Sequence, residues 1–136
     1  MSARCLVCGA EAWRGHHPSG RDPGSGRYLD PRFTVPACHD HHELFHDDWR
    51  ALGIEDSAKA ERGARPLTFV ERAAWFFRRG SLLAGRLAAA YPEHPWIARL
   101  AEALKRRADE LASDIAARDR RDPGWRRDPS FYPAEA

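Results

Sequence analysis

The chain has 136 residues and a mass of 15.4 kDa, which suits one domain or a small module with an extension. Apolar residues make up 43% and charged residues 31%, a composition that predicts a packed core and excludes wholesale disorder. No run approaches the ~18 uninterrupted apolar residues of a membrane helix. The N-terminal residues show no apolar signal segment, and a net charge of +2 excludes a strongly basic coat. We therefore expect a cytoplasmic protein without a membrane partner.

The metal-ligating residue types are concentrated at one end of the chain. All three cysteines and six of the seven histidines lie within the first 46 residues. An odd number of cysteines disfavours a secreted disulfide scaffold, and in a reducing compartment grouped Cys and His indicate metal binding or catalysis. The remainder is rich in Arg and Ala. The two parts of the chain are thus expected to have different roles.

In the first part, short strands are expected over 11–17 and 33–35, with the second one stopped by Pro36. The segment 18–31 between them is rich in Gly and Pro and predicts a loop. A helix is expected to start at Cys38 or His39 and to run to about residue 52, with Gly53 as its C-cap.

The second part predicts two amphipathic helices. Thr68 followed three residues later by Glu71 is a capping-box signature, and the helix that it opens is expected to run to about Ala90. A turn over 91–95 leads to a helix over 96–118, in which apolar residues recur at spacings of three and four. This arrangement predicts an antiparallel helical hairpin. Its apolar side is expected to carry these residues: Phe69, Ala73, Phe76, Phe77, Leu83, Leu87, Ile97, Leu100, Leu104, Ala108, Leu111 and Ile115.

Two residue pairs have the spacing of zinc ligands: Cys5-x-x-Cys8 and Cys38-x-x-His41. Tetrahedral zinc takes four such donors, and a Cys₃His set is common in structural sites. Because a module this small has little core of its own, zinc binding would supply much of its folding free energy. The alternative is a group of buried free thiols with surface histidines. A thioredoxin-like redox pair is disfavoured, since no βαβ pattern surrounds the first two cysteines.

More histidines remain than one structural zinc requires. His42 and His46 stand four residues apart on the expected helix and therefore share a face. His16 and His17 end the first expected strand, where adjacent side chains point to opposite sides. One of that pair can thus bind a metal while the other faces a substrate.

Residues 3–52 resemble the zinc-containing branch of the HNH nucleases, which have the ββα-metal fold. The resemblance lies in the order and spacing of Cys5-Leu6-Val7-Cys8, Gly15-His16-His17-Pro18 and Cys38-His39-Asp40-His41-His42-Glu43-Leu44-Phe45-His46. His41 stands where that branch usually has a fourth Cys. No family is recognised for residues 54–136.

The resemblance implies a role for each matching residue. His17 matches the general base that activates a water molecule, and His16 and His42 match ligands of a catalytic divalent ion, Mg²⁺ or another divalent cation. His46 matches a further His near the phosphate. Cys5, Cys8, Cys38 and His41 match the shell of a structural zinc.

The Asn of the family's name is absent, because the chain contains no Asn at all. We expect Asp30 to orient His17 by accepting the other ring N–H, as carboxylates do for catalytic histidines. The leading expectation is an endonuclease or nickase that acts on nucleic acid, with DNA favoured. The alternative is a degenerate, non-catalytic zinc module that binds nucleic acid or a protein. The near-neutral charge of the first 50 residues and the missing Asn favour this alternative.

The expected fold class is α+β and mostly helical. A zinc-stabilised ββα-metal module over 1–53 is followed by a linker over 54–66, a helical hairpin over 67–120 and a flexible tail over 121–136. Since two helices cannot bury their apolar stripes fully on each other, a second copy or a protein partner is expected on the extension.

Overall fold

The structure is a computed structural model, and it describes residues 3–22, 27–51 and 66–134. Its elements are β1 (Arg14–His16), β2 (Val35–Ala37), α1 (His39–Ala51), α2 (Phe69–Ala90) and α3 (Pro95–Arg121), followed by short 3₁₀ helices at Trp125–Arg127 and Pro129–Phe131. The described chain is therefore mostly helical with one two-stranded sheet, as expected for the α+β class. Residues 54–65 of the linker expected over 54–66, and the expected C-cap at Gly53, lie outside the described residues.

The antiparallel sheet pairs Arg14 with Ala37, Gly15 with Pro36, and His16 with Val35. The second strand was expected to stop before Pro36, and this was wrong, because the strand includes that residue. The carbonyl of Pro36 accepts a hydrogen bond from the backbone N–H of Leu6, at 2.9 Å, and so faces away from β1. The nitrogen of Pro36 faces the same way, so its missing N–H costs no bond between the strands.

The expected helix start at Thr68 is confirmed. Glu71 donates its backbone N–H to the Thr68 hydroxyl, and the Glu71 carboxylate accepts the Thr68 backbone N–H at 3.2 Å. These reciprocal bonds satisfy two backbone donors that the first helical turn leaves without partners. The helical hairpin is also confirmed, and its second helix extends three residues past the expected end at Arg118.

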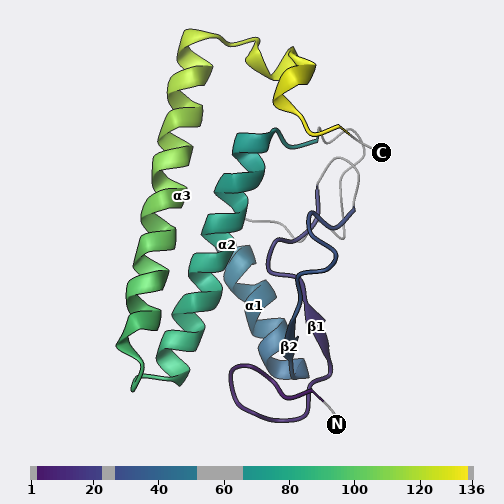
Figure 1. The fold of residues 1–136 in the computed structure, drawn as a ribbon, viewed down its shortest axis with the longest axis vertical. Coiled ribbons are helices and arrows are strands. Elements are labelled where there is room, and N and C mark those ends of the chain that lie inside the picture. The colour runs from purple at the N-terminus through teal and green to yellow at the C-terminus, as the bar shows by residue number, and fades with distance from the viewer. Residues whose placement is uncertain (1–2, 23–26, 52–65, 135–136) are drawn as a thin grey trace.

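The elements form two layers. Figure 1 shows α2 and α3 side by side and antiparallel, with α1 packed on α2 and the sheet lying beyond α1. The Arg86 guanidinium of α2 donates to both carboxylate oxygens of Asp48 on α1, at 2.8 and 2.6 Å. The Tyr91 hydroxyl at the end of α2 donates to the Leu6 carbonyl at 2.8 Å. The hairpin thus contacts the N-terminal part directly.

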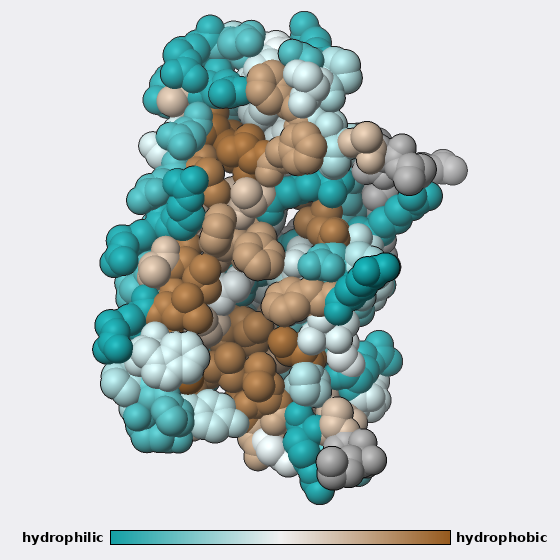
Figure 2. Space-filling view, in the orientation of Figure 1, coloured by the Kyte–Doolittle hydropathy of each residue, from teal (hydrophilic) through white to brown (hydrophobic). Residues whose placement is uncertain are grey.

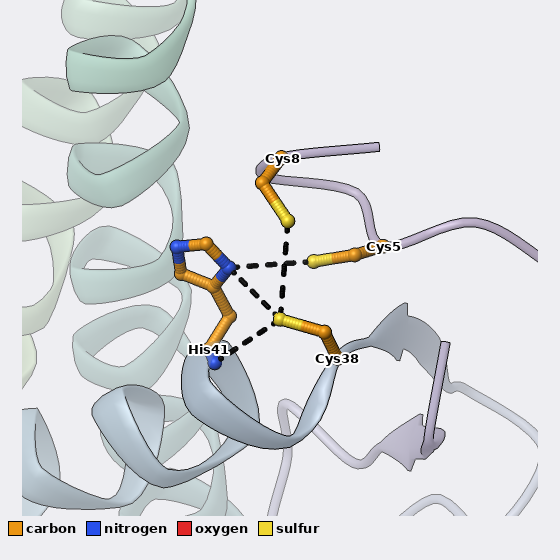
Figure 3. Close-up of side chains that lie close together, drawn as sticks. All are labelled: Cys5, Cys8, Cys38 and His41. Atoms are coloured by element: carbon orange, nitrogen blue, oxygen red, sulfur yellow. Dashed lines mark hydrogen bonds between the residues drawn. The ribbon is translucent and has the colours of Figure 1, made fainter. Parts of the chain in front are cut away.

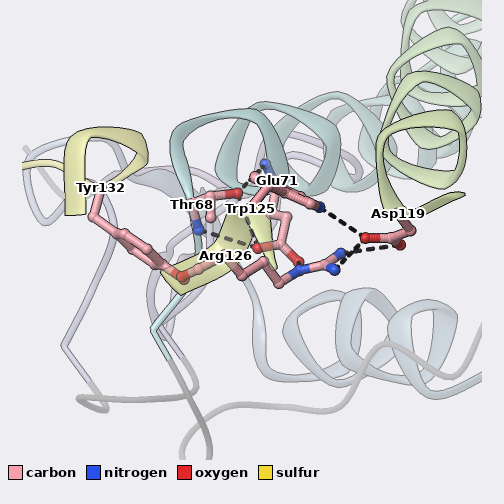
Figure 4. A network of polar contacts seen from close by, with 6 residues as sticks. All are labelled: Thr68, Glu71, Asp119, Trp125, Arg126 and Tyr132. Carbon is pink, nitrogen blue, oxygen red and sulfur yellow. Dashed lines mark hydrogen bonds and ion pairs between the residues drawn. The ribbon is translucent and has the colours of Figure 1, made fainter. Parts of the chain in front are cut away.

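A flexible tail was expected over residues 121–136, and this expectation was wrong for residues 122–132. Trp125 is only 2% exposed, and its indole N–H donates to the Asp119 carboxylate of α3 at 2.8 Å. Arg126 pairs with both Asp119 and Glu71, as Figure 4 shows, and the Tyr132 hydroxyl donates to the Arg126 carbonyl. The three prolines suggested disorder, but a buried tryptophan and a shared arginine fix this segment across the start of α2.

Apolar side chains remain on one face of the molecule. Figure 2 shows them running over the helical hairpin and toward the N-terminal part. Phe69 and Phe76, both expected on the apolar side of the hairpin, are 55% and 40% exposed. Phe76 lies 6.4 Å, centroid to centroid, from the exposed ring of Phe33. Residues buried between α2 and α3 include Ala84, Ile97, Ala108 and Leu111. Among the described helices, none is both long enough and apolar enough to cross a bilayer.

Trp125→Ala should lower the free energy of unfolding by about 3–5 kcal/mol, because it leaves a cavity and removes one of the hydrogen-bond partners of Asp119. Denaturant unfolding checks this value. Trp96→Ala is the matched control, since Trp96 is 56% exposed, and its effect should stay within about 0.5 kcal/mol. Equal losses for the two variants would contradict the packing of the C-terminal segment.

Candidate functional site

Four thiol and imidazole groups converge at the start of α1. Figure 3 shows Cys5 and Cys8 reaching in from the N-terminal loop and Cys38 and His41 from the start of the helix. The Cys8 and Cys38 sulfurs are 3.8 Å apart, and His41 Nδ1 lies 3.2 Å from the Cys38 sulfur and 3.6 Å from that of Cys5. All four donor atoms lie within 4.8 Å of one another. This Cys/His cluster could hold a metal ion such as zinc.

The distances within the cluster suit a tetrahedral ion. Zn–S bonds of ~2.3 Å in tetrahedral geometry separate two sulfurs by about 3.8 Å, the spacing seen between Cys8 and Cys38. All three cysteines are free thiols, so none is withdrawn from the set by a disulfide. The donor chemistry and the spacing therefore both fit the zinc that the sequence predicts.

Local backbone structure brings the two halves of the cluster together. A tight turn closes with the Gly9 N–H donating to the Cys5 carbonyl at 2.9 Å, and Gly9 has φ +75°, a backbone conformation that glycine adopts readily. The bond from Leu6 to the Pro36 carbonyl places this turn beside β2, which leads directly into Cys38. Burial acts to raise the pKa of the Cys5 thiol, but nearby backbone N–H groups, from Cys38 first, outweigh it and hold the pKa at about 6. The thiolate form that binds metals is thereby favoured.

A second cluster joins three imidazoles from β1 and α1: His16, His42 and His46. Their donor atoms also lie within 4.8 Å of one another. The ring centroids are 5.5 Å apart for His16 and His42, 5.3 Å for His16 and His46, and 4.6 Å for His42 and His46. The resemblance implied His16 and His42 as ligands, and the structure adds His46, which was expected near the phosphate. The sequence signal for His46 was its spacing of four residues from His42, since this spacing puts both side chains on one helical face.

His16 is the buried member of this second cluster and is 2% exposed. Its Nδ1 atom is buried and has no hydrogen-bond partner among the described residues. Burial first, and then the neighbouring imidazoles, lower the pKa of His16 to about 3, so its ring is neutral near pH 7. A buried, neutral nitrogen without a hydrogen bond is costly unless something binds it, and a metal ion would do so.

The donor set of the second cluster discriminates between the metals considered. Its three donors are all imidazole nitrogens, whereas Mg²⁺ prefers oxygen ligands in octahedral geometry. Imidazole suits zinc and other transition metals. The described residues therefore do not support Mg²⁺ here. A transition-metal ion such as zinc fits these three nitrogens better.

His17 lies beside the three imidazoles on the wall of one cavity. This cavity has a volume of about 180 Å³ and is lined by Arg14, Gly15, His16, His17, Gly20, Arg21, Tyr28, His42, His46 and Trp49. The His17 ring stacks on Tyr28 with centroids 3.7 Å apart and an interplanar angle of 15°. His16, the last residue of β1, is buried, whereas His17, just after the strand, is half-buried at the cavity. The cavity thus combines a candidate metal set with a further imidazole outside that set.

Burial first, and then the charge of Arg21, lower the pKa of His17. A hydrogen bond to the Pro31 backbone and the charge of Asp30 act in the opposite direction. Asp30 was expected to accept a ring N–H of His17, but its side chain is exposed in a turn, and no hydrogen bond joins these two side chains in the described part of the chain. Asp30 therefore acts on His17 through its charge, beside the hydrogen bond to the Pro31 backbone.

Several cavity residues were not singled out from the sequence as site residues. Tyr28 stacks on His17, and its hydroxyl accepts a hydrogen bond from Arg21 at 2.8 Å. Trp49 packs against His16 and His46 at centroid distances of 5.0 Å each. An aromatic residue in a Gly-rich loop or at the end of a helix carries no sequence signal for such a contact. His39, by contrast, is exposed and belongs to neither cluster.

Comparisons with models of protein families, with curated proteins and with solved structures find no match to this chain. The chemistry of the site must therefore be argued from its own residues.

Cys8→Ser should unfold the N-terminal part and lower the bound metal at both clusters, by about two equivalents, because zinc at the Cys/His cluster supplies its folding free energy. His42→Ala should lower the bound metal by only about one equivalent, because the Cys/His cluster keeps all its donors and stays folded. Elemental analysis with circular dichroism measures both effects. His39→Ala is the matched control on the same helix and should change neither. A folded Cys8→Ser protein with the zinc content of the wild type would contradict the assignment.

Proposed function

We propose that this protein is a metal-dependent nuclease that hydrolyses phosphodiester bonds in nucleic acid, with DNA as the favoured substrate. The observation that carries the proposal is one cavity in which His17 stands beside the cluster of His16, His42 and His46. Hydrolysis of a phosphodiester needs a base for water and positive charge at the phosphate. This cavity offers groups suited to both roles.

In the proposed reaction, a water oxygen attacks phosphorus and His17 takes a proton from that water. The bond between phosphorus and the leaving sugar oxygen breaks, and that oxygen gains a proton from solvent. His17 suits this role because its lowered pKa leaves a neutral ring that can accept a proton near pH 7. A divalent ion held by the three imidazoles would polarise the phosphate and stabilise charge on the leaving oxygen.

Arginine side chains at the cavity suit a phosphate backbone. Arg14 and Arg21 both line it, and a guanidinium can donate two hydrogen bonds to one phosphate. Arg21 also lies over the Tyr28 ring, with its guanidinium carbon 4.4 Å from the centroid, and so is held close to His17. The N-terminal part is near neutral in total, but these two arginines give it local positive charge at the cavity, where a phosphate would enter.

The resemblance of residues 3–52 to HNH nucleases supports the same proposal. On that basis, zinc at Cys5, Cys8, Cys38 and His41 is structural and holds α1 against the N-terminal loop. Three free thiols suit a reducing compartment, so we place the activity in the cytoplasm. A zinc ion is proposed for both clusters.

Binding of a protein partner without catalysis is the second candidate function. The exposed rings of Phe33, Phe69 and Phe76 favour it, since aromatic residues are enriched at interfaces. In this case both metal clusters would be structural. Stoichiometric metal with no cleavage of any nucleic acid would favour this second function over the first.

His17→Ala should reduce cleavage of supercoiled plasmid by about 10²–10⁴-fold, because the water loses its general base. The measurement uses the purified protein with Zn²⁺, Mn²⁺ or Mg²⁺ and follows nicked and linear products on gels. Metal content and the unfolding midpoint should stay at their wild-type values.

His39→Ala is the control for this experiment, since the exposed His39 lies outside the cavity. This variant should cleave the plasmid at the wild-type rate. Undiminished cleavage by His17→Ala would show that the base is assigned to the wrong residue. Activity with Mg²⁺ alone in a protein that lacks bound transition metal would contradict the choice of ion.

A further inference from the structure

The segment 17–22 after β1 carries two side chains on which the proposed reaction depends. His17 and Arg21 both lie on the cavity wall, and Gly20 lines it between them. The Gly20 N–H donates to the His17 carbonyl at 3.0 Å, and the Leu29 N–H donates to the Gly20 carbonyl at 2.9 Å. The position of this segment therefore decides where the candidate base and one candidate phosphate ligand stand.

A buried arginine of α2 reaches this segment. Arg79 is 3% exposed, and its guanidinium donates to the Ser19 carbonyl. Gly20 has φ +70°, and a Cβ at this position would overlap the Arg79 guanidinium. A glycine is thus required here both by the backbone conformation and by the close approach of the arginine.

The same guanidinium also lies against aromatic rings. Its carbon is 4.7 Å from the centroid of Trp49 and 5.0 Å from that of Trp75. Trp49 in turn contacts His16 and His46. Arg79 is therefore in contact with the segment that carries His17 on one side and with the wall of the three-imidazole cluster on the other.

A second arginine of α2, two helical turns earlier, contacts the end of the segment. Arg72 lies 3.3 Å from the carboxylate of Asp22, which is almost fully buried. Residues seven apart share one face of a helix, so Arg72 and Arg79 contact the segment from one side. A buried charge is costly without a partner, and movement of the segment would separate these groups.

We propose that Arg79, together with Arg72, is a positioning residue for the reaction and that α2 is therefore part of the active site. The proposal rests on the proposed nuclease function. It gives the helical extension a role in catalysis, because the two arginines fix segment 17–22 so that His17 and Arg21 face the three imidazoles. Neither arginine lines the cavity, so they act through the segment and not on the substrate.

The test compares Arg79→Met with Arg79→Lys in the full chain. Arg79→Met should lower kcat for plasmid cleavage by about 10²-fold, the scale expected for a small misplacement of reacting groups. The Gly20 and Leu29 amides should exchange hydrogen faster, while the metal content stays at the wild-type value. Arg79→Lys keeps a donor for the Ser19 carbonyl and should recover at least about tenfold of the lost rate.

Arg78→Met is the matched control, because Arg78 is the adjacent arginine of α2 and faces the gap between α2 and α3. It should leave both kcat and amide exchange unchanged. Asp22→Asn is the second variant, for use if Arg79→Met does not fold, and it should speed exchange and lower kcat by about tenfold.

Two outcomes overturn the proposal: wild-type kcat in Arg79→Met and Asp22→Asn, or equal losses in Arg78→Met and Arg79→Met. Cleavage by none of the proteins, including the wild type, would instead refute the nuclease function. In that case the exchange of the Gly20 and Leu29 amides still decides whether α2 holds the segment in place.

Discussion

The convergence of two cysteines from the N-terminal loop with Cys38 and His41 at the start of α1 is the constraint on which the N-terminal part depends. A two-stranded sheet of three residues per strand buries little apolar surface and is marginal by itself. The donor cluster joins segments about 30 residues apart in the chain and fixes where α1 begins. Once the start of α1 is fixed, the directions in which its side chains point are fixed as well.

The two clusters share α1 because consecutive helical residues point in different directions. His41 faces the N-terminal loop, whereas His42 and His46 face β1 and meet His16. A metal in the first cluster would thus orient the helix that supplies two donors to the second. The physical link between them is one rigid helix, so loss of the first cluster is expected to disturb the second.

The helical extension contacts the N-terminal part through charged groups as much as through apolar packing. Arg86 pairs with Asp48 of α1, and the Arg79 guanidinium lies against two tryptophan rings and donates to a backbone carbonyl. The start of α2 is in turn held by the C-terminal segment, in which Arg126 bridges Glu71 and Asp119. Polar networks of this kind specify one arrangement, because each member loses its partner if the elements shift.

The sequence by itself determined the elements and the donor types. The capping box at Thr68, the apolar periodicity of the hairpin and the Cys/His spacings depend on local chemistry within a few residues, so they can be recognised without a fold. The inclusion of Pro36 in a strand could not be recognised in this way, because it depends on which direction its backbone groups face.

Only the tertiary structure decided how distant residues meet. It added His46 to the three-imidazole cluster, left the Asp30 side chain exposed, and brought Arg79 to the Ser19 carbonyl. It also ordered the segment around Trp125, whose prolines suggested a tail. Each of these contacts joins a residue to a neighbour set by packing, and side-chain packing between separate elements leaves no periodic trace in the sequence.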